Sequence, residues 1–126
     1  MPESLRDGKK EKTLVVIPAL NEAEQIAHVV QEVRKKVPEA QVLVVNDGSS
    51  DQTEKIALRA GAKVLSHPFN MGYGVALQTG YKYALQYGFD YVLQMDGDGQ
   101  HDPRYLQGLL NEVQEGGVDV AIGSRF

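Results

Sequence analysis

The sequence predicts an α/β domain built on a mostly parallel sheet with helices on both faces. Two observations support this fold class. Short runs of β-branched and aliphatic residues alternate along the chain with longer segments whose apolar residues recur at helical spacing. The connections between these segments are short, and polar turn residues follow the apolar runs. This alternation is typical of parallel strands joined by right-handed helical crossovers.

The same patterns assign the individual strands and helices. Apolar runs predict strands at residues 13–17, 42–45, 64–65, 91–95 and 118–122. The expected helices extend from an N-cap at Asn21 to Pro38, from a cap at Ser50 or Asp51 to Gly61, from the glycine-rich turn at 70–74 to Gly88, and over residues 105–113. We expect residues 1–12 to be a disordered polar leader and residues 13–126 to form one domain. Because the chain stops directly after its last strand, we expect that domain to be incomplete at its C-terminal end.

Composition and charge exclude several classes of protein. The 126 residues are 42% hydrophobic, which is enough for a packed core, and the formal net charge is −4. A basic surface for nucleic acid is therefore not expected, and the lack of cysteine excludes disulfides and thiolate metal sites. No apolar run approaches the roughly 20 residues of a membrane-spanning helix. We expect a cytoplasmic protein that is at most peripheral to the inner face of the membrane.

Two carboxylates one residue apart follow the fourth predicted strand. Asp96 and Asp98 come directly after the apolar run that ends at Met95, and Gly97 and Gly99 flank Asp98. Neighbouring carboxylates repel each other unless a positive charge lies between them, and glycines let a backbone approach a ligand closely. A hard divalent cation completed by water and phosphate fits this pattern, although an isolated Asp-x-Asp is more often a solvated acidic turn.

Polar residues at the other strand ends strengthen the metal interpretation. In an open parallel sheet, ligands bind outside the carboxyl ends of the strands, near a switch in strand order. Here these ends carry three acidic or amide turns and a segment with an arginine, at residues 18–22, 46–48, 96–98 and 123–125. Together they predict a site for a diphosphate, its metal and a polar nucleoside.

Other uses of an Asp-x-Asp pattern fit less well. A nucleophile of the haloacid dehalogenase type would lie on the first strand, and a calcium loop would need Gly and Glu where His101 and Gln107 stand. A nucleotidyltransferase would need a glycine-rich basic loop after the first strand, where residues 18–22 are acidic and contain no glycine. A dinucleotide site is weak, because the turn with Gly72 and Gly74 lacks the third glycine of that motif.

Five segments in register resemble the family 2 glycosyltransferases, in particular the polyprenyl-phosphate sugar transferases of the dolichyl-phosphate mannose synthase type. The matching segments are residues 16–22, 45–51, 70–74, 96–103 and 123–126. The resemblance extends from residue 13 to residue 126 and implies a three-layer, Rossmann-like GT-A fold. It also implies a nucleotide-diphosphate-sugar donor and a Mg²⁺ or Mn²⁺ cofactor.

The resemblance further implies roles for individual residues. Pro18, Ala19, Asn21 and Glu22 would line the nucleoside pocket, with Glu22 near the ribose. Asp47 would hydrogen-bond the base, and Asn46 stands where the family usually has a first aspartate. The remaining implied roles are donor contact for Asn70 and Gly74, metal ligation for Asp96, Asp98 and Gln100, and phosphate contact for Arg125. Asp96, Asp98 and Arg125 would form the catalytic set.

The implied activity is transfer of a sugar from a UDP- or GDP-sugar, with inversion, to a polyprenyl phosphate or a growing glycan. An aspartate alone does not decide between uracil and guanine, because either ring offers an N–H. The alternative is a catalytically inactive nucleotide- and metal-binding fragment that lacks the acceptor site. Membrane contact is expected only through a segment beyond Phe126, and the sheet edge at 118–122 invites a homodimer. His28 and His67 have no partner visible in the sequence and receive no role.

Overall fold

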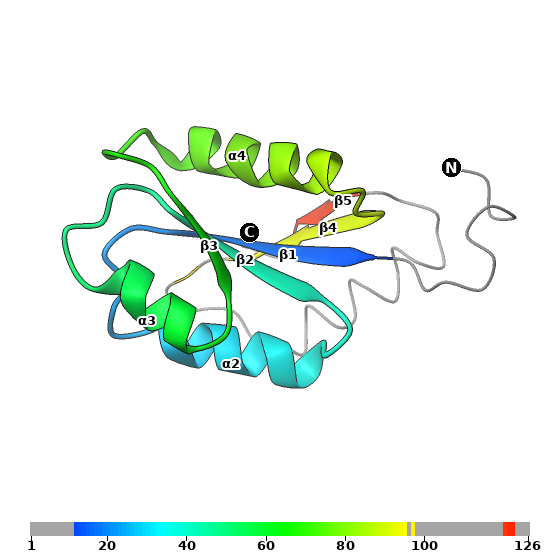
Figure 1. Cartoon of the computed structure of the whole chain (residues 1–126), viewed down its shortest axis with the longest axis horizontal. Coiled ribbons are helices and arrows are strands. Elements are labelled where there is room, and N and C mark those ends of the chain that lie inside the picture. Colours follow the sequence, from blue (N-terminus) through cyan, green and yellow to red (C-terminus); the bar gives the residue numbers. More distant parts are fainter. Residues whose placement is uncertain (1–11, 96, 98–119, 123–126) are drawn as a thin grey trace, which may run out of the picture.

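The computed structural model describes residues 12–95, 97 and 120–122, and this part of the chain forms a three-layer α/β structure (Figure 1). Its strands are β1 (Thr13–Ala19), β2 (Gln41–Asn46), β3 (Lys63–Ser66), β4 (Tyr91–Gln94) and β5 (Val120–Ile122). Its helices are α2 (Ile26–Lys36), α3 (Thr53–Arg59) and α4 (Tyr73–Gln86). The helix predicted at 105–113 and the first two residues of the strand predicted at 118–122 lie outside the described residues.

The strands form one parallel sheet in the order β3-β2-β1-β4-β5. β1 lies at the centre, where Ile17 pairs with Val44 of β2 and Val15 pairs with Leu93 of β4. Every residue of β1 is buried, which explains why the strand is an uninterrupted apolar run rather than an alternating one. The predicted parallel sheet is therefore confirmed.

Helices cover both faces of this sheet. In Figure 1, α2 and α3 lie on one face and α4 lies on the other. Successive side chains of β1 point to opposite faces. Val15 and Ile17 therefore belong to the apolar cluster that includes α2 and α3, whereas Leu14 and Val16 belong to the cluster that includes α4. The predicted three-layer architecture is confirmed.

α4 packs directly on the central strand. Gly80 is buried on the inner side of α4, and a Cβ atom added there would lie 2.5 Å from Val16 Cγ1. A hydrogen bond also joins α4 to the sheet: the Tyr81 hydroxyl donates to Oε1 of the buried Gln94 at 2.5 Å. The missing side chain at position 80 thus sets the distance between α4 and the sheet.

The start of α2 differs from the prediction. Asn21 does not cap this helix, which begins at Ile26 after the N-cap Gln25. Instead, Asn21 Oδ1 accepts the Ser50 amide at 2.8 Å, and the Asn21 amide donates to Ser49 Oγ at 2.9 Å. The turn after β1 is therefore tied to the turn after β2 rather than to the helix that follows it in sequence.

The ends of α3 lie closer to their predicted positions. The N-cap is Gln52, directly after the expected Ser50 or Asp51. Asp51 nevertheless contributes to the helix start, because its Oδ1 atom accepts the Thr53 amide at 2.9 Å. The helix ends just before Gly61, as predicted.

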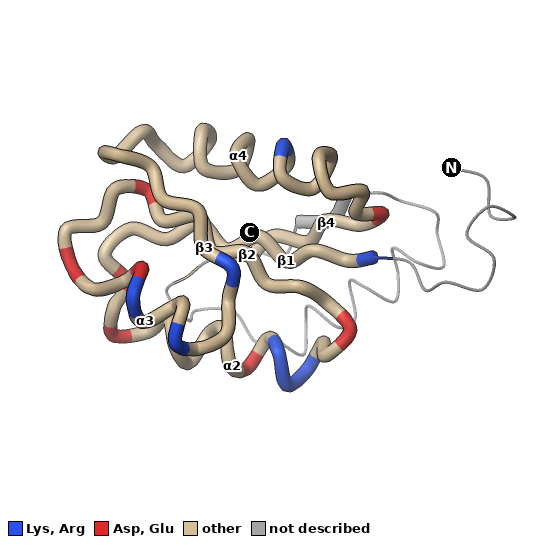
Figure 2. The backbone as a smooth tube through the Cα atoms, in the orientation of Figure 1, with Lys and Arg blue, Asp and Glu red and all other residues tan. Residues whose placement is uncertain are grey.

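The charged side chains of α2 and α3 are exposed or half-buried. Figure 2 shows Lys, Arg, Asp and Glu along α2 and α3 and in the connecting loops. Arg34, Lys35 and Lys36 gather in the last turn of α2, where they meet the negative end of the helix dipole. Within the described ranges, no helix combines the length and the apolar composition that a membrane crossing requires.

Candidate functional site

A cavity of about 490 Å³ opens at the carboxyl ends of the strands. Its wall comes from segments that are far apart in the sequence: the end of β1 with its following turn, the residue after β2, the start of α4, and the turn after β4. The lining residues are Pro18, Ala19, Leu20, Glu22, Asp47, Asn70, Gly72, Tyr73, Ala76 and Gly97.

The strand order explains the position of this cavity. From β1 the chain moves outward through β2 to β3, returns over the opposite face through α4, and continues with β4 on the other side of β1. The direction of winding therefore reverses between β1 and β4. Ligands of open parallel sheets bind outside the strand ends at such a switch point, and the cavity lies at the described part of the rim that the sequence predicts.

The structure brings together most of the residues that we expected to contact the donor. Pro18, Ala19, Glu22, Asp47 and Asn70 all line the cavity. Two others, Asn21 and Gly74, are not among the lining residues. Asn21 is engaged with the turn after β2, and Gly74 lies in the first turn of α4 with open space around it. The contacts of all seven residues with a donor stay predictions.

The predicted metal ligands Asp96, Asp98 and Gln100 and the predicted phosphate contact Arg125 lie outside the described residues. Gly97, the residue between the two aspartates, is described, is buried and lines the cavity. A Cβ atom at Gly97 would lie 3.2 Å from the Pro18 carbonyl oxygen, so the backbone after β4 passes close beside the end of β1. Of the Asp-x-Asp pattern, only the central glycine is described, and it lies at this cavity.

The described lining of the cavity is acidic. It contains the carboxylates of Glu22 and Asp47 and, among the described residues, neither lysine nor arginine. A diphosphate would therefore meet negative charge there unless a cation lay between. The part of the chain that the structure describes holds no group of three or more His, Cys, Asp or Glu side chains suited to a metal. Mg²⁺ and Mn²⁺ prefer oxygen ligands, and metal ligation by the adjoining Asp-x-Asp pattern stays a prediction.

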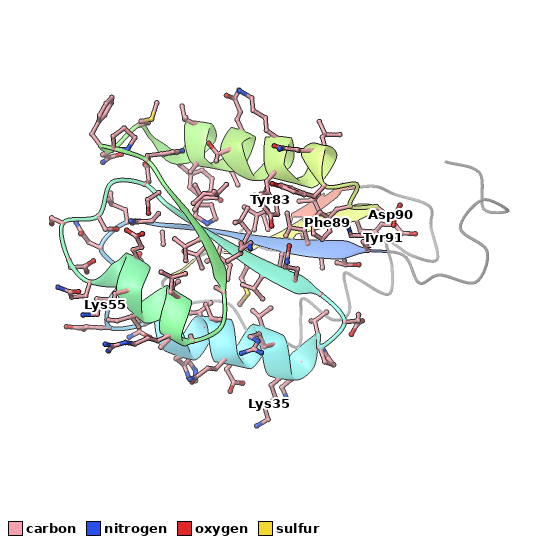
Figure 3. The ribbon with its side chains drawn as sticks, in the orientation of Figure 1. Lys35, Lys55, Tyr83, Phe89, Asp90 and Tyr91 are labelled. Carbon is pink, nitrogen blue, oxygen red and sulfur yellow. The ribbon has the colours of Figure 1, made fainter. Side chains whose placement is uncertain are left out.

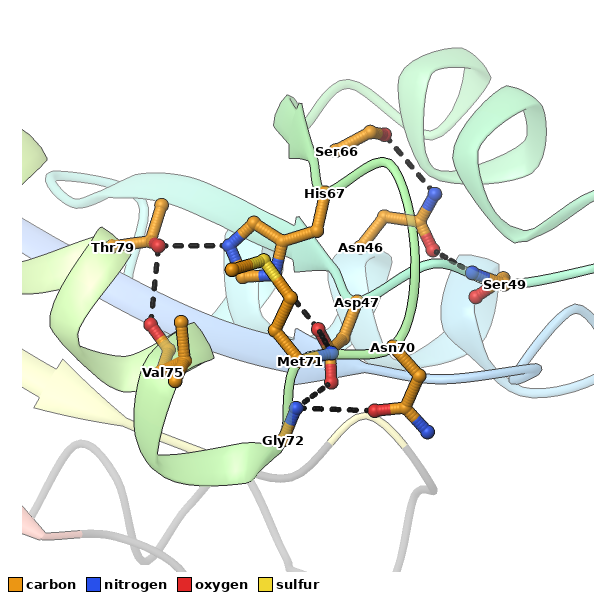
Figure 4. Close-up of polar contacts among 10 residues, drawn as sticks. All are labelled: Asn46, Asp47, Ser49, Ser66, His67, Asn70, Met71, Gly72, Val75 and Thr79. Atoms are coloured by element: carbon orange, nitrogen blue, oxygen red, sulfur yellow. Dashed lines mark hydrogen bonds and ion pairs between the residues drawn. The ribbon is translucent and has the colours of Figure 1, made fainter.

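Asp47 connects three segments at the wall of the cavity, as Figure 4 shows. Its Oδ1 atom accepts the Met71 amide at 2.9 Å and lies 2.7 Å from His67 Nδ1. Its Oδ2 atom accepts the Gly72 amide at 2.9 Å. These contacts join the end of β2 to the residue after β3 and to the start of α4, so one carboxylate organises this part of the rim.

The same contacts determine the charge state of Asp47. Burial raises the pKa of this carboxyl group. The hydrogen bonds from His67, Met71 and Gly72, together with electrostatic attraction to His67, outweigh burial and hold the pKa below the ordinary value of an aspartate. The residue is 5% exposed, and a buried carboxylate is tolerated where donors occupy its oxygens.

His67 is the site residue that the sequence analysis missed. Its ring lies between Asp47 and α4, where Nε2 is 2.8 Å from Thr79 Oγ1. Strand pairing is the signal that could have found it. Asn46 pairs with Ser66, so the residues that follow β2 and β3, Asp47 and His67, leave the sheet side by side. That register is a tertiary property and is not visible in the sequence.

Asn46 has a structural role that suits an amide. Its Nδ2 atom donates to Ser66 Oγ at 3.0 Å, and its Oδ1 atom accepts the Ser49 amide at 3.2 Å. An ionised aspartate could accept the amide but could not donate to the hydroxyl. Asparagine, which stands where the family usually has an aspartate, thus connects the end of β2 to the end of β3 through its amide group.

The turn after β2 and the segment before α4 pack backbone against backbone. Gly48 has a φ angle of +77°, and a Cβ atom at this position would overlap the Phe69 carbonyl carbon and the Asn70 amide nitrogen. Glycine satisfies both constraints, because it adopts positive φ freely and has no side chain. The two turns that line the cavity are therefore fixed relative to each other.

A second cavity, of about 530 Å³, lies at the amino ends of the strands. Tyr83 and Phe89, which Figure 3 labels at that end of the sheet, contribute to its wall, and their ring centroids are 6.0 Å apart. Lys12 Nζ donates to the Tyr87 carbonyl at 2.6 Å and lies 4.6 Å from the centre of the Phe89 ring. None of the predicted site residues that the structure describes lines this cavity, so we place the candidate site at the carboxyl rim.

Comparison with known proteins identifies relatives of this chain. The chain is 37% identical over 122 residues to the polyprenol monophosphomannose synthase of Mycolicibacterium smegmatis, in an alignment that covers 92% of this chain and 46% of the relative. It is 37% identical over 119 residues to the undecaprenyl-phosphate mannosyltransferase of Micrococcus luteus, which covers 90% of this chain and 48% of that relative. The chain thus spans about half the length of the curated relatives it matches.

A solved structure shares the fold as well. The glucosyl-3-phosphoglycerate synthase from Mycobacterium tuberculosis, in complex with Mn²⁺, UDP and glucosyl-3-phosphoglycerate, superposes with a TM-score of 0.68 at 28% sequence identity. The superposition covers 88% of this chain and 42% of that chain, and the predicted GT-A architecture is confirmed. A family profile matches residues 14–126, which include the whole sheet from the second residue of β1 and the cavity at its rim. Because the match extends that far, the chain belongs to glycosyl transferase family 2.

Proposed function

We propose that this chain binds the donor of a hexosyltransferase, holding the nucleotide of a UDP- or GDP-sugar while the sugar is transferred with inversion. The observation that carries the proposal is the cavity at the strand-order switch, which Glu22 and Asp47 line with carboxylates. Carboxylates suit a nucleoside, because ribose hydroxyls and ring N–H groups are hydrogen-bond donors. The family match and the UDP complex of the structural relative support the same class of ligand.

A divalent metal, Mg²⁺ or Mn²⁺, is part of the proposal. Asp96, Asp98 and Gln100 would hold it, and an ion bound there would offset the negative charge that grows on the leaving diphosphate. Arg125 would contact phosphate oxygens, which an arginine fork matches well. The acidic lining of the described cavity and the Mn²⁺ in the structural relative support a cation at this rim.

The acceptor of the whole protein is proposed to be a polyprenyl phosphate or a growing glycan. The names of the two mannosyl-transferring relatives support a lipid-linked acceptor. An ionised phosphate oxygen can attack the anomeric carbon directly, on the face opposite the departing diphosphate, whereas a hydroxyl acceptor needs a general base. Because the chain spans about half of its relatives, a nucleotide- and metal-binding fragment without turnover is the alternative. A transfer assay with a polyprenyl phosphate distinguishes the two.

Calorimetric titration with UDP and with GDP, each with and without Mn²⁺, tests donor binding. We expect metal-dependent binding of one of these nucleotides. Asp98→Ala should abolish the part of nucleotide binding that depends on Mn²⁺, while circular dichroism shows that the fold is intact. Glu39→Ala is the matched control, because it removes the same charge from an exposed position beside the opposite cavity. If the unaltered chain bound a nucleotide equally well without Mn²⁺, the assignment of Asp98 as a metal ligand would be wrong. If the chain bound neither UDP nor GDP, the proposal for this chain would be contradicted.

A further inference from the structure

Among the described residues, the contacts to Asp47 leave one hydrogen-bond acceptor position for a ligand. A carboxylate offers about four such positions, two on each oxygen. Both positions on Oδ1 are used, by the Met71 amide at 2.9 Å and by His67 Nδ1 at 2.7 Å. One position on Oδ2 is used, by the Gly72 amide at 2.9 Å. The remaining position belongs to a residue that lines the candidate nucleoside cavity.

The His67 ring is held in the orientation that fills Oδ1. The low pKa of Asp47 keeps its carboxylate ionised, and an ionised carboxylate only accepts, so Nδ1 carries the hydrogen of this contact. At the other side of the ring, Nε2 lies 2.8 Å from Thr79 Oγ1. The His67 side chain is only 10% exposed. The ring therefore cannot turn away from Asp47 without losing its contacts at both nitrogens.

We infer that His67 is a positioning residue that sets base specificity: by occupying Oδ1 it leaves Asp47 a single acceptor, which selects uracil over guanine. The inference rests on the proposed function, since it concerns the same donor site. Uracil presents one ring N–H at its pairing edge, whereas guanine presents a ring N–H and an adjacent amino group. A carboxylate binds that guanine pair with both oxygens, whereas the contacts from the described residues leave a free position only on Oδ2. Guanine would keep one buried donor unpaired, which lowers its affinity.

The loop contacts of Asp47 reinforce this selection. The amides on its two oxygens come from Met71 and Gly72, and Gly72 both precedes the first residue of α4 and lines the cavity. Rotation of the carboxylate to present both oxygens to a ligand would therefore break the contact with His67 and release the loop as well. Uracil binding requires no such rotation.

Titration of this chain with UDP, GDP and N3-methyl-UDP in the presence of Mn²⁺ tests the inference. We expect UDP to bind about tenfold more tightly than GDP, the factor that corresponds to one unpaired buried donor. N3-methyl-UDP lacks the ring N–H that Asp47 would accept, so it should bind at least as weakly as GDP. This comparison uses the unaltered chain and remains informative even if a variant fails to fold.

Variants of His67 separate positioning from a merely structural role. His67→Ala frees a position on Oδ1, so the preference for UDP over GDP should shrink to about threefold or less. His67→Asn should restore the preference, because its side-chain amide can donate from near the position of Nδ1. A structural role alone would weaken both nucleotides equally and leave their ratio unchanged. Tyr83→Phe is the control, since it removes a hydroxyl that contacts Gln41 at 3.1 Å, beside the opposite cavity.

The outcomes distinguish the inference from the proposed function. Equal affinities for UDP and GDP, tighter binding of GDP, or an unchanged ratio in His67→Ala would overturn the inference and leave the donor-binding proposal standing. Binding of neither nucleotide would overturn both. A UDP preference that His67→Ala removes and His67→Asn restores would support the inference.

Discussion

Asp47 shows how a single side chain can serve both the fold and the site. It receives donors from three positions that the sequence separates by 20 to 25 residues. A carboxylate in this environment is buried but satisfied, so it contributes stability as long as it stays ionised. The charge state of this residue therefore links the order of the rim to pH.

Stability should fall in acid through Asp47. Its folded pKa lies below its unfolded value, so the unfolded state binds the proton first as the pH falls. The contribution of Asp47 to the free energy of unfolding is complete above the pKa of the unfolded state, about 3.9. It is lost as the pH falls through the pKa of the folded state. We expect the thermal midpoint to drop below about pH 4, with a shallower drop in Asp47→Asn. Equal slopes in the two proteins would show that other carboxylates carry the acid sensitivity.

Gly48 and Gly88 form a matched pair for testing the packing of the two turns. Their φ angles are +77° and +71°, so alanine at either position meets the same backbone strain, about 1–2 kcal/mol. Only at Gly48 would the added Cβ also overlap backbone atoms, those of Phe69 and Asn70. We expect Gly48→Ala to lose more stability than Gly88→Ala in urea denaturation and to weaken nucleotide binding as well. Equal losses and unchanged binding in both variants would mean that the turns adjust freely.

At the scale of the elements, the contact between α4 and β1 controls where the rim of the cavity lies. α4 begins at the cavity and crosses the sheet above Val16, where Gly80 allows the close approach. The bond from Tyr81 to Gln94 connects the same helix to β4. Because α4 carries Thr79, the partner of His67, a shift of this helix would reach the site through that contact.

Gly80→Ala tests this contact in a double-mutant cycle with Val16→Ala. Alanine is favoured over glycine inside a helix by about 1 kcal/mol, so a net loss must come from the clash with Val16. We expect Gly80→Ala to lower the free energy of unfolding by about 1–3 kcal/mol. The double variant should lose less than the sum of the two single losses, because Val16→Ala removes the atoms that clash. Strict additivity in urea denaturation would show that α4 has moved instead.

At the scale of the whole molecule, the sheet and its rim follow from patterns that the sequence carries locally. The runs at 13–17 and 42–45 are apolar without interruption because both faces of these strands are covered. Once such strands are assigned and joined by crossovers, the turns at 18–22 and 46–48 must share one edge of the sheet. The structure confirms that placement, since both turns contribute to one cavity.

The features that sequence reasoning missed all depend on contacts between distant segments. Asn21 has the local pattern of an N-cap, yet amides at 50–51 compete for its side chain. The backbone before α2 is likewise held by the start of α3, because the Glu22 amide donates to Thr53 Oγ1 at 2.9 Å. His67 acquires its partner only through the register of β2 against β3. Local propensity cannot supply such register.

The hydrogen bonds from Met71 and Gly72 to Asp47 have a consequence for the kinetics of ligand capture. They hold the loop before α4 with the protein's own atoms, so the order of this loop does not depend on a ligand. Fixing the backbone of one residue costs about 1–2 kcal/mol of conformational entropy, and here that entropy is lost during folding. A nucleotide that enters the cavity would therefore not have to order this loop. We expect encounter and desolvation, rather than closure of this loop, to govern how fast the nucleotide binds.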